Sequence, residues 1–332
     1  MQARRPPDTR PLPKSVAETS ASKDPPLALV SVIIPTYNRA PYIAEAIRSV
    51  QAQMYPRVEI IVADDGSTDN TAEIIAQFAD AVTYLCLPHR GQPAATRNAA
   101  LAAAHGEYIA FLDSDDLFLP TKLTTQVAAL TEHPEVGMVY SNGYFFRDDP
   151  QSPTGRVLDG LPTPSGDALP DLLRGNFLAS PVVLLRRACL EKAGPFDEDP
   201  ALFVAEDYEL WLRVAAHFPF IYTPGDVAAI RRHRQSISRD VATVRSGVLR
   251  VLAKLEATNP QLARQYRDAL NEGYARNHGA IALALFAERQ ILSGLRHAFQ
   301  ALRYSLGSPG FGTRAFFQWV LRRRVRGKGA MP

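Results

Sequence analysis

The residues LALVSVIIP, at positions 27–35, form a continuous apolar run that is rich in β-branched side chains. Such a run is typical of a strand that is buried on both faces, as in the parallel sheets of α/β proteins. The segment YIAEAIRSVQAQ (42–53) follows with helical spacing, which places Ile43, Ile47 and Val50 on one face. A buried strand followed by an amphipathic helix is the first part of a βαβ unit.

The alternation of strands and helices continues along the chain. Repeated βα units predict a doubly wound, mostly parallel α/β sheet that is flanked by helices. Ser67 or Thr68 is positioned to cap the second helix. The further strands are VEIIVADD (58–65), AVTYLCL (81–87) and EYIAFLD (107–113), and the further helices are STDNTAEIIAQFA (67–79) and PAATRNAALAAA (93–104).

Acidic residues gather where two of these strands end. DDGSTD (64–69) ends the second strand, and AFLDSDDLFLP (110–120) contains the end of the fourth. Ligands of open α/β sheets bind beyond the carboxyl ends of the strands. The two acidic clusters are therefore expected to converge on one ligand-binding edge.

Asp113 and Asp115 form a D-x-D pair at the end of a buried strand. Side chains two apart in an extended segment point the same way, so both carboxylates can reach one divalent cation. Mg²⁺ and Mn²⁺ accept such ligands and bridge to diphosphate oxygens. We expect a metal site here. The alternative is a helix cap, because a helical pattern follows and Asp favours caps.

The loops after the first two strands suit a nucleoside. Tyr37, in PTYN (35–38), offers an aromatic face to a base, and Asp65 offers an acceptor to a uracil imide N–H or a ribose hydroxyl. Turn formation by Asp-Gly-Ser is the alternative. No Walker A pattern and no G-x-G-x-x-G follows the first strand, which argues against a P-loop NTPase and a dinucleotide binder. Arg90 and Arg97 lie near the start of the third helix, where they suit phosphate or surface pairing.

The second half of the sequence is more broken and then becomes helical. Gly194 is the expected C-cap of a helix that follows directly on a strand. The segments are a strand at VGMVYSNGYFF (136–146), a variable loop at 148–170, a strand and helix at SPVVLLRRACLEKAG (180–194), a helix at AEDYELWLRVAAHF (205–218) and helical patterns from Val241 onward.

Four segments resemble, in order and spacing, the motifs of family 2 glycosyltransferases, the inverting enzymes of the GT-A fold. They are VSVIIPTYNRAPYIAEAIRSVQAQ (30–53), VEIIVADDGSTDNTAEII (58–75), GQPAATRNAAL (91–101) and GEYIAFLDSDDLFLP (106–120). The resemblance covers about residues 29–240. It implies a Rossmann-like GT-A core, a nucleotide diphosphate sugar as donor, and Mg²⁺ or Mn²⁺ as cofactor.

The resemblance also implies roles for single residues. AEDYELWLR looks like the E-D motif of the family, in which the Asp is the base, so Asp207 is the expected base with Glu206 beside it. The alternative is that both only offset the dipole of the helix that they open. IRRHRQSIS (230–238) resembles the segment that closes over the diphosphate, although its arginines also suit a solvated basic face. The expected nucleotide-sugar contacts are Pro35, Thr36, Tyr37, Asn38, Asp65, Arg97, Asp113, Ser180, Arg231, Arg232 and Ser236, and the expected metal ligands are Asp115, Asp113, Asp116 and His233.

The two ends of the chain differ from the rest. Residues 1–27, rich in Pro, Ser and charges, predict a disordered tail. GFGTRAFFQWVLRRRVRGKG (310–329) combines apolar and aromatic residues with five arginines and one lysine. Such a segment suits an interfacial helix on an anionic membrane, or a terminal helix that packs on its own domain. The predicted parts are the tail at 1–27, a GT-A domain at 28–240, a helical subdomain at 241–310 and a basic amphipathic tail at 311–332.

Composition sets broader limits. The chain has 332 residues, of which 46% are hydrophobic and 21% charged, and this composition is typical of an ordinary globular protein. Its net charge of +3 is too small to indicate binding of nucleic acid. Cys86 and Cys189 are expected to be buried free thiols. No run reaches the roughly 18 apolar residues of a membrane span, and the N-terminus has no signal-peptide core. We expect a cytoplasmic protein that contacts the inner face of the plasma membrane through its C-terminal basic helix.

Together these features predict an inverting, metal-dependent glycosyltransferase. The expected donor is a UDP-sugar, with GDP- and dTDP-sugars as alternatives. The expected acceptor is a hydroxyl of a glycan or a lipid-linked glycan of the cell envelope. One alternative is a sugar-phosphate nucleotidyltransferase, which would normally carry a Gly-rich basic loop that PTYNRAPY (35–42) does not provide. The other is a non-catalytic scaffold, against which the intact D-x-D and E-D pairs count.

Overall fold

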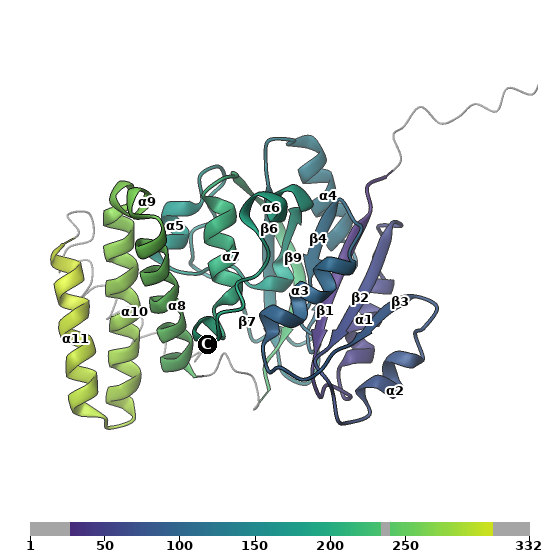
Figure 1. Ribbon diagram of the computed structural model, residues 1–332, viewed down its shortest axis with the longest axis horizontal. Coiled ribbons are helices and arrows are strands. Elements are labelled where there is room, and N and C mark those ends of the chain that lie inside the picture. Colours follow the sequence, from purple (N-terminus) through teal and green to yellow (C-terminus); the bar gives the residue numbers. More distant parts are fainter. Residues whose placement is uncertain (1–26, 234–239, 308–332) are drawn as a thin grey trace, which may run out of the picture.

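The computed structural model describes residues 27–233 and 240–307 (Figure 1). The amphipathic basic tail predicted at 311–332, residues 1–26 of the predicted disordered tail, and Ser236 lie outside the described residues.

The first half of the described chain is a parallel βα repeat. Strands β1, β2, β3 and β4 pair in the order β3-β2-β1-β4, all parallel. Val30 in β1 lies opposite Val58 in β2 and Tyr108 in β4, so the strands are in step where they start. The elements are β1 (Val30–Thr36), α1 (Ile43–Gln51), β2 (Val58–Asp64), α2 (Thr71–Ala76), β3 (Val82–Cys86), α3 (Pro93–Ala103) and β4 (Tyr108–Phe111).

The second half extends this sheet with mixed strand directions. β8 runs antiparallel to both β4 and β6, whereas β9 runs parallel to β6 and antiparallel to β5. The predicted mostly parallel sheet is therefore confirmed in its first half, and the antiparallel β8 joins the two halves. The elements are β5 (Leu117–Phe118), α4 (Lys122–Glu132), β6 (Met138–Phe146), β7 (Gly155–Arg156), α5 (Leu169–Arg174), β8 (Val183–Arg186), α6 (Arg187–Ala193), α7 (Glu206–Ala215) and β9 (Phe220–Arg231).

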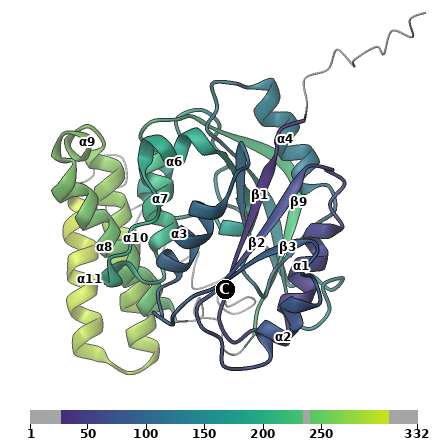
Figure 2. The ribbon, with the colours of Figure 1, turned by 45° about the vertical axis from the view of Figure 1, so that its right-hand side comes forward.

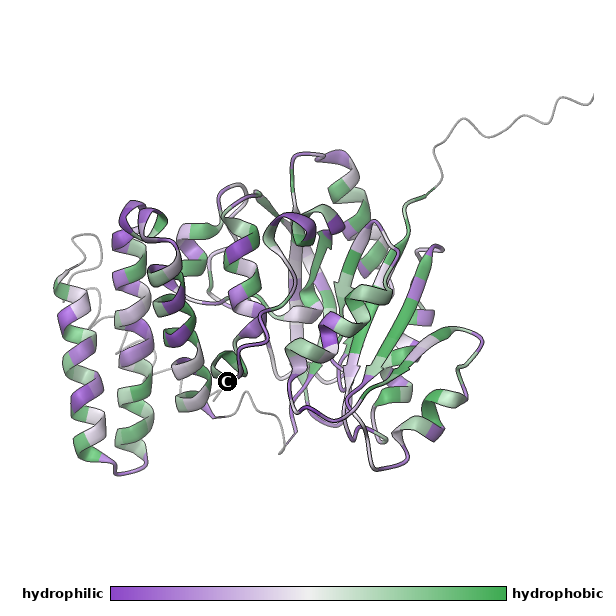
Figure 3. Cartoon of the chain, viewed as in Figure 1, coloured by the Kyte–Doolittle hydropathy of each residue, from purple (hydrophilic) through white to green (hydrophobic). Residues whose placement is uncertain are grey.

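The sheet has a hydrophobic core on each face. Alternate residues of β1 point to opposite faces, as the pleat of a strand requires. Val32 and Ile34 belong to a cluster with α1 and α4, and Ile33 belongs to a second cluster with α3, α5 and α7. Figure 2 shows α1 and α2 on one side of the strands and α3, α6 and α7 on the other. The strands β1 and β2 are coloured as hydrophobic along most of their length in Figure 3, which fits their burial between two layers.

The C-terminal helices stand side by side at one end of the molecule (Figure 1). α8 and α10 contribute Val248, Leu252 and Leu270 to the same cluster as Ile33 and Trp211, so the core is continuous across residue 240. One long helical pattern at 260–290 breaks at Tyr266 into two helices. These helices are α8 (Val241–Thr258), α9 (Pro260–Gln265), α10 (Arg267–Ala287) and α11 (Ile291–Leu306).

Two predicted helix caps are wrong. α2 begins at Thr71, and the Ser67 hydroxyl instead donates to Asp64 Oδ1 at 2.6 Å, within the loop before the helix. α4 begins at Lys122 with Thr121 as its N-cap. The acidic cluster at 113–116 lies well before that point, so it does not cap the helix. The predicted C-cap at Gly194 is confirmed.

The two cysteines differ in exposure. Cys189 is buried in α6, and its thiol donates to the Gly137 carbonyl at 3.2 Å. Cys86 is exposed because it is the last residue of the edge strand β3. Its predicted burial is therefore wrong. Both thiols are free. Among the described residues, no helix is long and apolar enough to cross a membrane.

Candidate active site

The loops that follow β1 and β2 are fastened to each other at the ligand-binding edge of the sheet. The Asp65 N–H donates to the Thr36 carbonyl at 2.9 Å, which extends the strand pairing by one step. Asn38 has a left-handed backbone (φ 50°), and its side-chain oxygen accepts from the Thr68 N–H at 2.8 Å. Asn38, predicted as a nucleotide contact, therefore also shapes the rim of the site.

Asp65 organises the loop before α3. Its carboxylate is buried and accepts the backbone N–H groups of Arg90 (2.9 Å) and Gly91 (2.8 Å). His89 Nδ1 lies 3.0 Å from the same carboxylate. The ring of His89 stacks on Tyr37 at 4.2 Å between centroids. Tyr37 remains exposed, so the pair presents an aromatic surface at the end of β1.

Two predicted residues of β1 lie at the base of this surface. Pro35 is half-buried and sits opposite Ala63 of β2. Thr36 is buried, and its hydroxyl has no hydrogen-bond partner among the described residues. Because buried polar groups are normally satisfied, an unpartnered hydroxyl at a strand end is a candidate contact for a ligand.

The three aspartates after β4 have three different environments. Asp113 accepts a hydrogen bond from Arg97 at 2.8 Å, and Asp115 Oδ2 lies 2.8 Å from His233 Nε2. Asp116 is buried and accepts the backbone N–H of Arg231 at 2.8 Å. The carboxylate of Asp116 thereby fastens the end of β9, a role that differs from both the predicted metal ligand and the predicted cap.

The aspartates repel one another. Burial raises the pKa of Asp113, and the nearby Asp115 raises it further, although Arg97 opposes the shift. Burial likewise raises the pKa of Asp116 well above its ordinary value, with both other aspartates adding to the effect. A cluster whose members disfavour each other's charge is stabilised by an added cation.

The donor set fits a divalent metal that shares its shell with a substrate. Within residues 27–233 and 240–307, no three His, Cys, Asp or Glu side chains form a preformed metal-binding group. Mg²⁺ commonly takes only one or two carboxylates and completes its shell with waters and substrate phosphates. Asp115 and Asp113, with His233 beside Asp115, provide such a partial set.

A buried arginine connects this acidic cluster with the start of α7. Arg97 donates to Asp113 Oδ1 and to Glu206 Oε1, both at 2.8 Å. Its side chain is 7% exposed, and the two carboxylates raise its pKa against the effect of burial. Arg97 therefore binds protein carboxylates, which differs from the predicted phosphate contact. The predicted surface pairing applies to Arg90, whose exposed guanidinium lies 3.4 Å from Glu198.

Asp207 is a partly exposed carboxylate of this group with a raised pKa. It lies in the first turn of α7 and is partly exposed, whereas its neighbour Glu206 is buried. Burial by the surrounding protein, followed by the charge of Glu206, raises the pKa of Asp207 to about 7. Its Oδ1 accepts the Tyr208 N–H at 2.6 Å, and its Oδ2 accepts the Ser180 hydroxyl at 3.2 Å.

Residues 230–233 are the described part of the segment predicted to close over the diphosphate. They are held by packing and ion pairs. The guanidinium of Arg231 pairs with Glu45, donates to the Asp115 carbonyl, and lies over the rings of Tyr42 and Phe146. Arg232 lies 3.5 Å from the ring centroid of Phe145. Arg231 is thus committed to protein contacts, which differs from the predicted phosphate contact.

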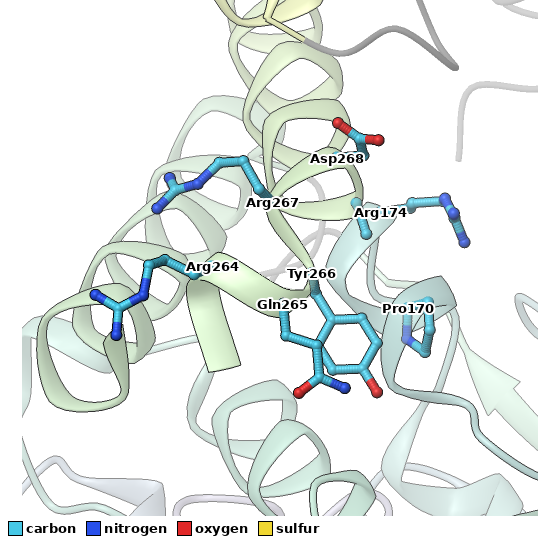
Figure 4. A pocket seen from close by; sticks show the side chains of 8 residues that line it. Pro170, Arg174, Arg264, Gln265, Tyr266, Arg267 and Asp268 are labelled. Carbon is cyan, nitrogen blue, oxygen red and sulfur yellow. The ribbon is translucent and has the colours of Figure 1, made fainter. Parts of the chain in front are cut away.

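A pocket of about 280 Å³ lies away from this site, where α5 meets the junction of α9 and α10 (Figure 4). Pro170 and Arg174 line it from α5. Arg174 also pairs with Glu272 of α10 at 3.1 Å. This pocket contains none of the predicted site residues, so we do not assign it to the reaction.

Sequence reasoning missed two features of the site. One is His89, which stacks on Tyr37. It lies in LPHRGQ (87–92), between a predicted strand and a predicted helix, and this position in a strand-end loop could have marked it as a site residue. The bridging role of Arg97 had no such signal, because Asp113 and Glu206 lie 16 and 109 residues away in the chain. Predicted residues that do gather in the structure are Asp113, Asp115, Asp116, Arg231 and His233 around the end of β4, and Arg97, Ser180, Glu206 and Asp207 around the start of α7.

Comparison with known sequences identifies a family match. Residues 31–187 match the profile described as Glycosyl transferase family 2. An Escherichia coli protein, UDP-Glc:alpha-D-GlcNAc-diphosphoundecaprenol beta-1,3-glucosyltransferase WfaP, is 36% identical over 190 residues, which cover 57% of this chain and 70% of that protein. An uncharacterized glycosyltransferase of Rickettsia conorii is 31% identical over 66% of this chain, but the match spans only 37% of that protein's length.

Solved structures share the fold. TarS residues 1–349 from S. aureus, in complex with UDP-GlcNAc, superpose with a TM-score of 0.63 at 20% identity, covering 85% of this chain and 82% of that one. The mannosyltransferase PcManGT from Pyrobaculum calidifontis, in complex with GDP-Man and Mn²⁺, gives a TM-score of 0.60 at 22% identity, covering 89% and 85%. At these identities the similarity shows the fold alone.

Proposed function

Because this chain belongs to glycosyl transferase family 2, we propose that it transfers a sugar from a nucleotide diphosphate sugar to an acceptor hydroxyl with inversion, using Asp207 as the general base. One observation carries the proposal. Asp207 is a partly exposed carboxylate at the site edge, and its pKa of about 7 suits a group that must take a proton near neutral pH.

The donor binds, in this proposal, between the loops after β1, β2 and β4. The stacked pair of Tyr37 and His89 provides an aromatic surface for the base. The unpartnered hydroxyl of Thr36 and the side chain of Asn38 lie beside it as hydrogen-bonding groups for the nucleoside. Asp65, with both oxygens bonded to backbone N–H groups, fixes the loop that carries His89.

The diphosphate lies next to the aspartates after β4. Asp115 and Asp113 would hold Mg²⁺ or Mn²⁺, with His233 beside Asp115. When bound, the metal supplies charge that stabilises the departing nucleoside diphosphate. Arg97 holds the Asp113 carboxylate in place from the buried side.

Asp207 acts on the acceptor. Its Oδ1 is held by the Tyr208 N–H and its Oδ2 by the Ser180 hydroxyl, which orients the carboxylate. As the acceptor oxygen attacks the anomeric carbon, the proton of that hydroxyl passes to Asp207, and the bond from the anomeric carbon to the diphosphate breaks. Attack from the face opposite to the leaving group inverts the configuration. Glu206 is buried and paired with Arg97, so it positions Arg97 and takes no proton from the substrate.

The name of one relative supports a donor class and an acceptor class. WfaP, by its name, uses UDP-glucose and acts on a sugar linked to diphosphoundecaprenol. We infer that this chain uses a UDP-sugar and extends a glycan or a lipid-linked acceptor of the cell envelope, at the cytoplasmic side of the membrane. A sugar-phosphate nucleotidyltransferase would instead release diphosphate from a nucleoside triphosphate, which provides a direct contrast in assays.

The test compares Asp207→Asn with the wild type, using UDP-sugars with Mn²⁺. We expect the variant to keep its thermal shift with the donor. Its rates of sugar transfer and of donor hydrolysis should fall by about 10²–10⁴-fold, as expected when a general base is removed. Asp115→Ala should lose the Mn²⁺-dependent shift. Asp80→Asn, which changes an exposed aspartate before β3, is the matched control. Full activity of Asp207→Asn, or release of diphosphate from UTP, would overturn the assignment.

A further inference from the structure

The outermost C-terminal helix, α11, exposes an apolar face. Leu292 and Phe299 are 84% and 67% exposed, and Ile291, Leu295 and Leu306 are each more than half exposed. In a helix, residues at i, i+3, i+7 and i+14 lie on one side. Leu292, Leu295, Phe299 and Leu306 follow that spacing. Together with Ile291, these residues are called the α11 apolar face.

A different side of α11 makes the contacts within the molecule. Gly294, Ala301 and Ser305 are buried, and a Cβ at Gly294 would lie 2.4 Å from the Phe286 ring of α10. Small residues let the two helices approach closely. Figure 1 shows α11 at the end of the molecule, with α10 beside it and no other labelled element of the described chain on its outer side. The apolar face is therefore not used for packing on α10.

The charged residues of α11 have one sign. Arg296 and Arg303 are exposed and lie beside the face on the helix surface. The sequence from 289 to 332 contains no Asp or Glu, whereas residues 290–332 contain seven arginines and one lysine. An exposed apolar face on a helix whose charged residues are arginines fits an occupant that is apolar and anionic together.

We propose that the α11 apolar face is a docking surface for an anionic lipid bilayer. The apolar side chains would enter the boundary between headgroups and acyl chains, while Arg296 and Arg303 pair with anionic headgroups. A second copy of the chain fits less well. Pairing of two α11 helices would bring arginines together without an acidic residue on either helix to compensate them.

The test measures co-sedimentation of the full chain with vesicles, without donor or acceptor, so that it is independent of the proposed catalysis. Vesicles of phosphatidylcholine mixed with phosphatidylglycerol are compared with phosphatidylcholine alone. We expect binding to the anionic vesicles that weakens with salt. Leu295→Ser/Phe299→Ser should reduce the partition coefficient by about tenfold or more, because each buried apolar side chain contributes about a tenfold factor.

Two further variants complete the test. Arg296→Ser/Arg303→Ser should reduce binding to anionic vesicles only. Met54→Ser changes an exposed apolar residue between α1 and β2 and should leave binding unchanged. Circular dichroism checks that each variant is folded. Unchanged binding of Leu295→Ser/Phe299→Ser would overturn the proposal, since the tail at 308–332 would then carry the binding. A wild-type dimer in solution that these two changes convert to monomer, without vesicle binding, would overturn it in favour of self-association.

Discussion

The raised pKa of Asp207 predicts the pH dependence of the reaction. A base must be ionised to accept a proton, so kcat/KM should increase about tenfold per pH unit below a pKa of about 7 and level off above it. The measurement is a pH profile of kcat/KM for the donor, which reports the ionisation of the free protein. A profile that is flat from about pH 5 to 8 would exclude Asp207 as the titrating base.

The same shift has a consequence for stability. The folded-state pKa of Asp207 lies above its ordinary value of 3.8, so the stability linked to its proton is fully present below that value and is lost progressively as pH rises to about 7. Asp207→Asn should therefore unfold at a higher temperature than the wild type at about pH 8, and the difference should shrink steadily as pH falls toward about 4. This readout distinguishes an inactive variant from an unfolded one.

Arg97 is expected to be important for both stability and activity. Arg97→Met would leave Asp113 and the buried Glu206 without their shared cation, which should cost about 3–5 kcal/mol of unfolding free energy. Arg97→Lys should be intermediate, since one ammonium cannot reproduce the forked contact. Urea denaturation gives the free energies, and donor turnover gives the activity.

Arg90→Met is the matched control for Arg97. Arg90 forms an exposed ion pair with Glu198, and such pairs contribute less than about 1 kcal/mol. If Arg97→Met cost no more than Arg90→Met, the bridge would have no structural role.

Single residues of the site were predictable where a motif placed them at a strand end or a helix start. Asp113, Asp115 and Asp207 belong to such motifs, and the structure brings them to one edge. The actual partners of Arg97, Arg231 and Asp116 were not predictable. Each depends on a contact between segments that are distant in the sequence, and composition gives no information about such contacts.

At the scale of elements, the βα repeat was predictable because each strand is a buried β-branched run and each helix has an apolar face. β9 was missed. Its segment contains Pro224 and Gly225, which normally argue against a strand. The pairing of β9 with β6 shifts register between Tyr140 and Asn142, and this irregularity accommodates them.

The junction of α10 with α5 provides a test at this scale. A Cβ at Gly273 would lie 2.1 Å from the Leu173 carbonyl oxygen, and that oxygen belongs to backbone. Gly273→Ala should therefore move α10 away from α5 and destabilise the protein by about 1–3 kcal/mol, measured by urea denaturation.

Gly175→Ala is the matched control, because it lies two residues beyond Leu173 in an extended conformation (φ 168°) with no atom within 4 Å of an added Cβ. We expect a change within about 0.5 kcal/mol. Equal effects of the two substitutions would show that α10 and α5 can separate without cost.

At the scale of the whole molecule, the predicted GT-A core and helical C-terminal part are both present. The predicted division at residue 240 remains a prediction, and the hydrophobic core is continuous across it. Val248 and Leu270 share one cluster with Ile33 of the central strand. Sequence periodicity identifies which helix faces are apolar, but it does not show which other element each face meets. For the same reason the exposed face of α11 could not be distinguished from its packed side beforehand.

The guanidinium of Arg97 also connects the donor side of the site with the acceptor side. Asp113 on the donor side raises the pKa of Asp207, and Arg97 lowers it. In the proposed mechanism, a bound donor would compensate the charge of Asp113, so the pKa of Asp207 should be lower in the donor complex than in the free protein. Arg97, which contacts both Asp113 and Glu206, thereby links the protonation state on the acceptor side to occupancy of the donor side.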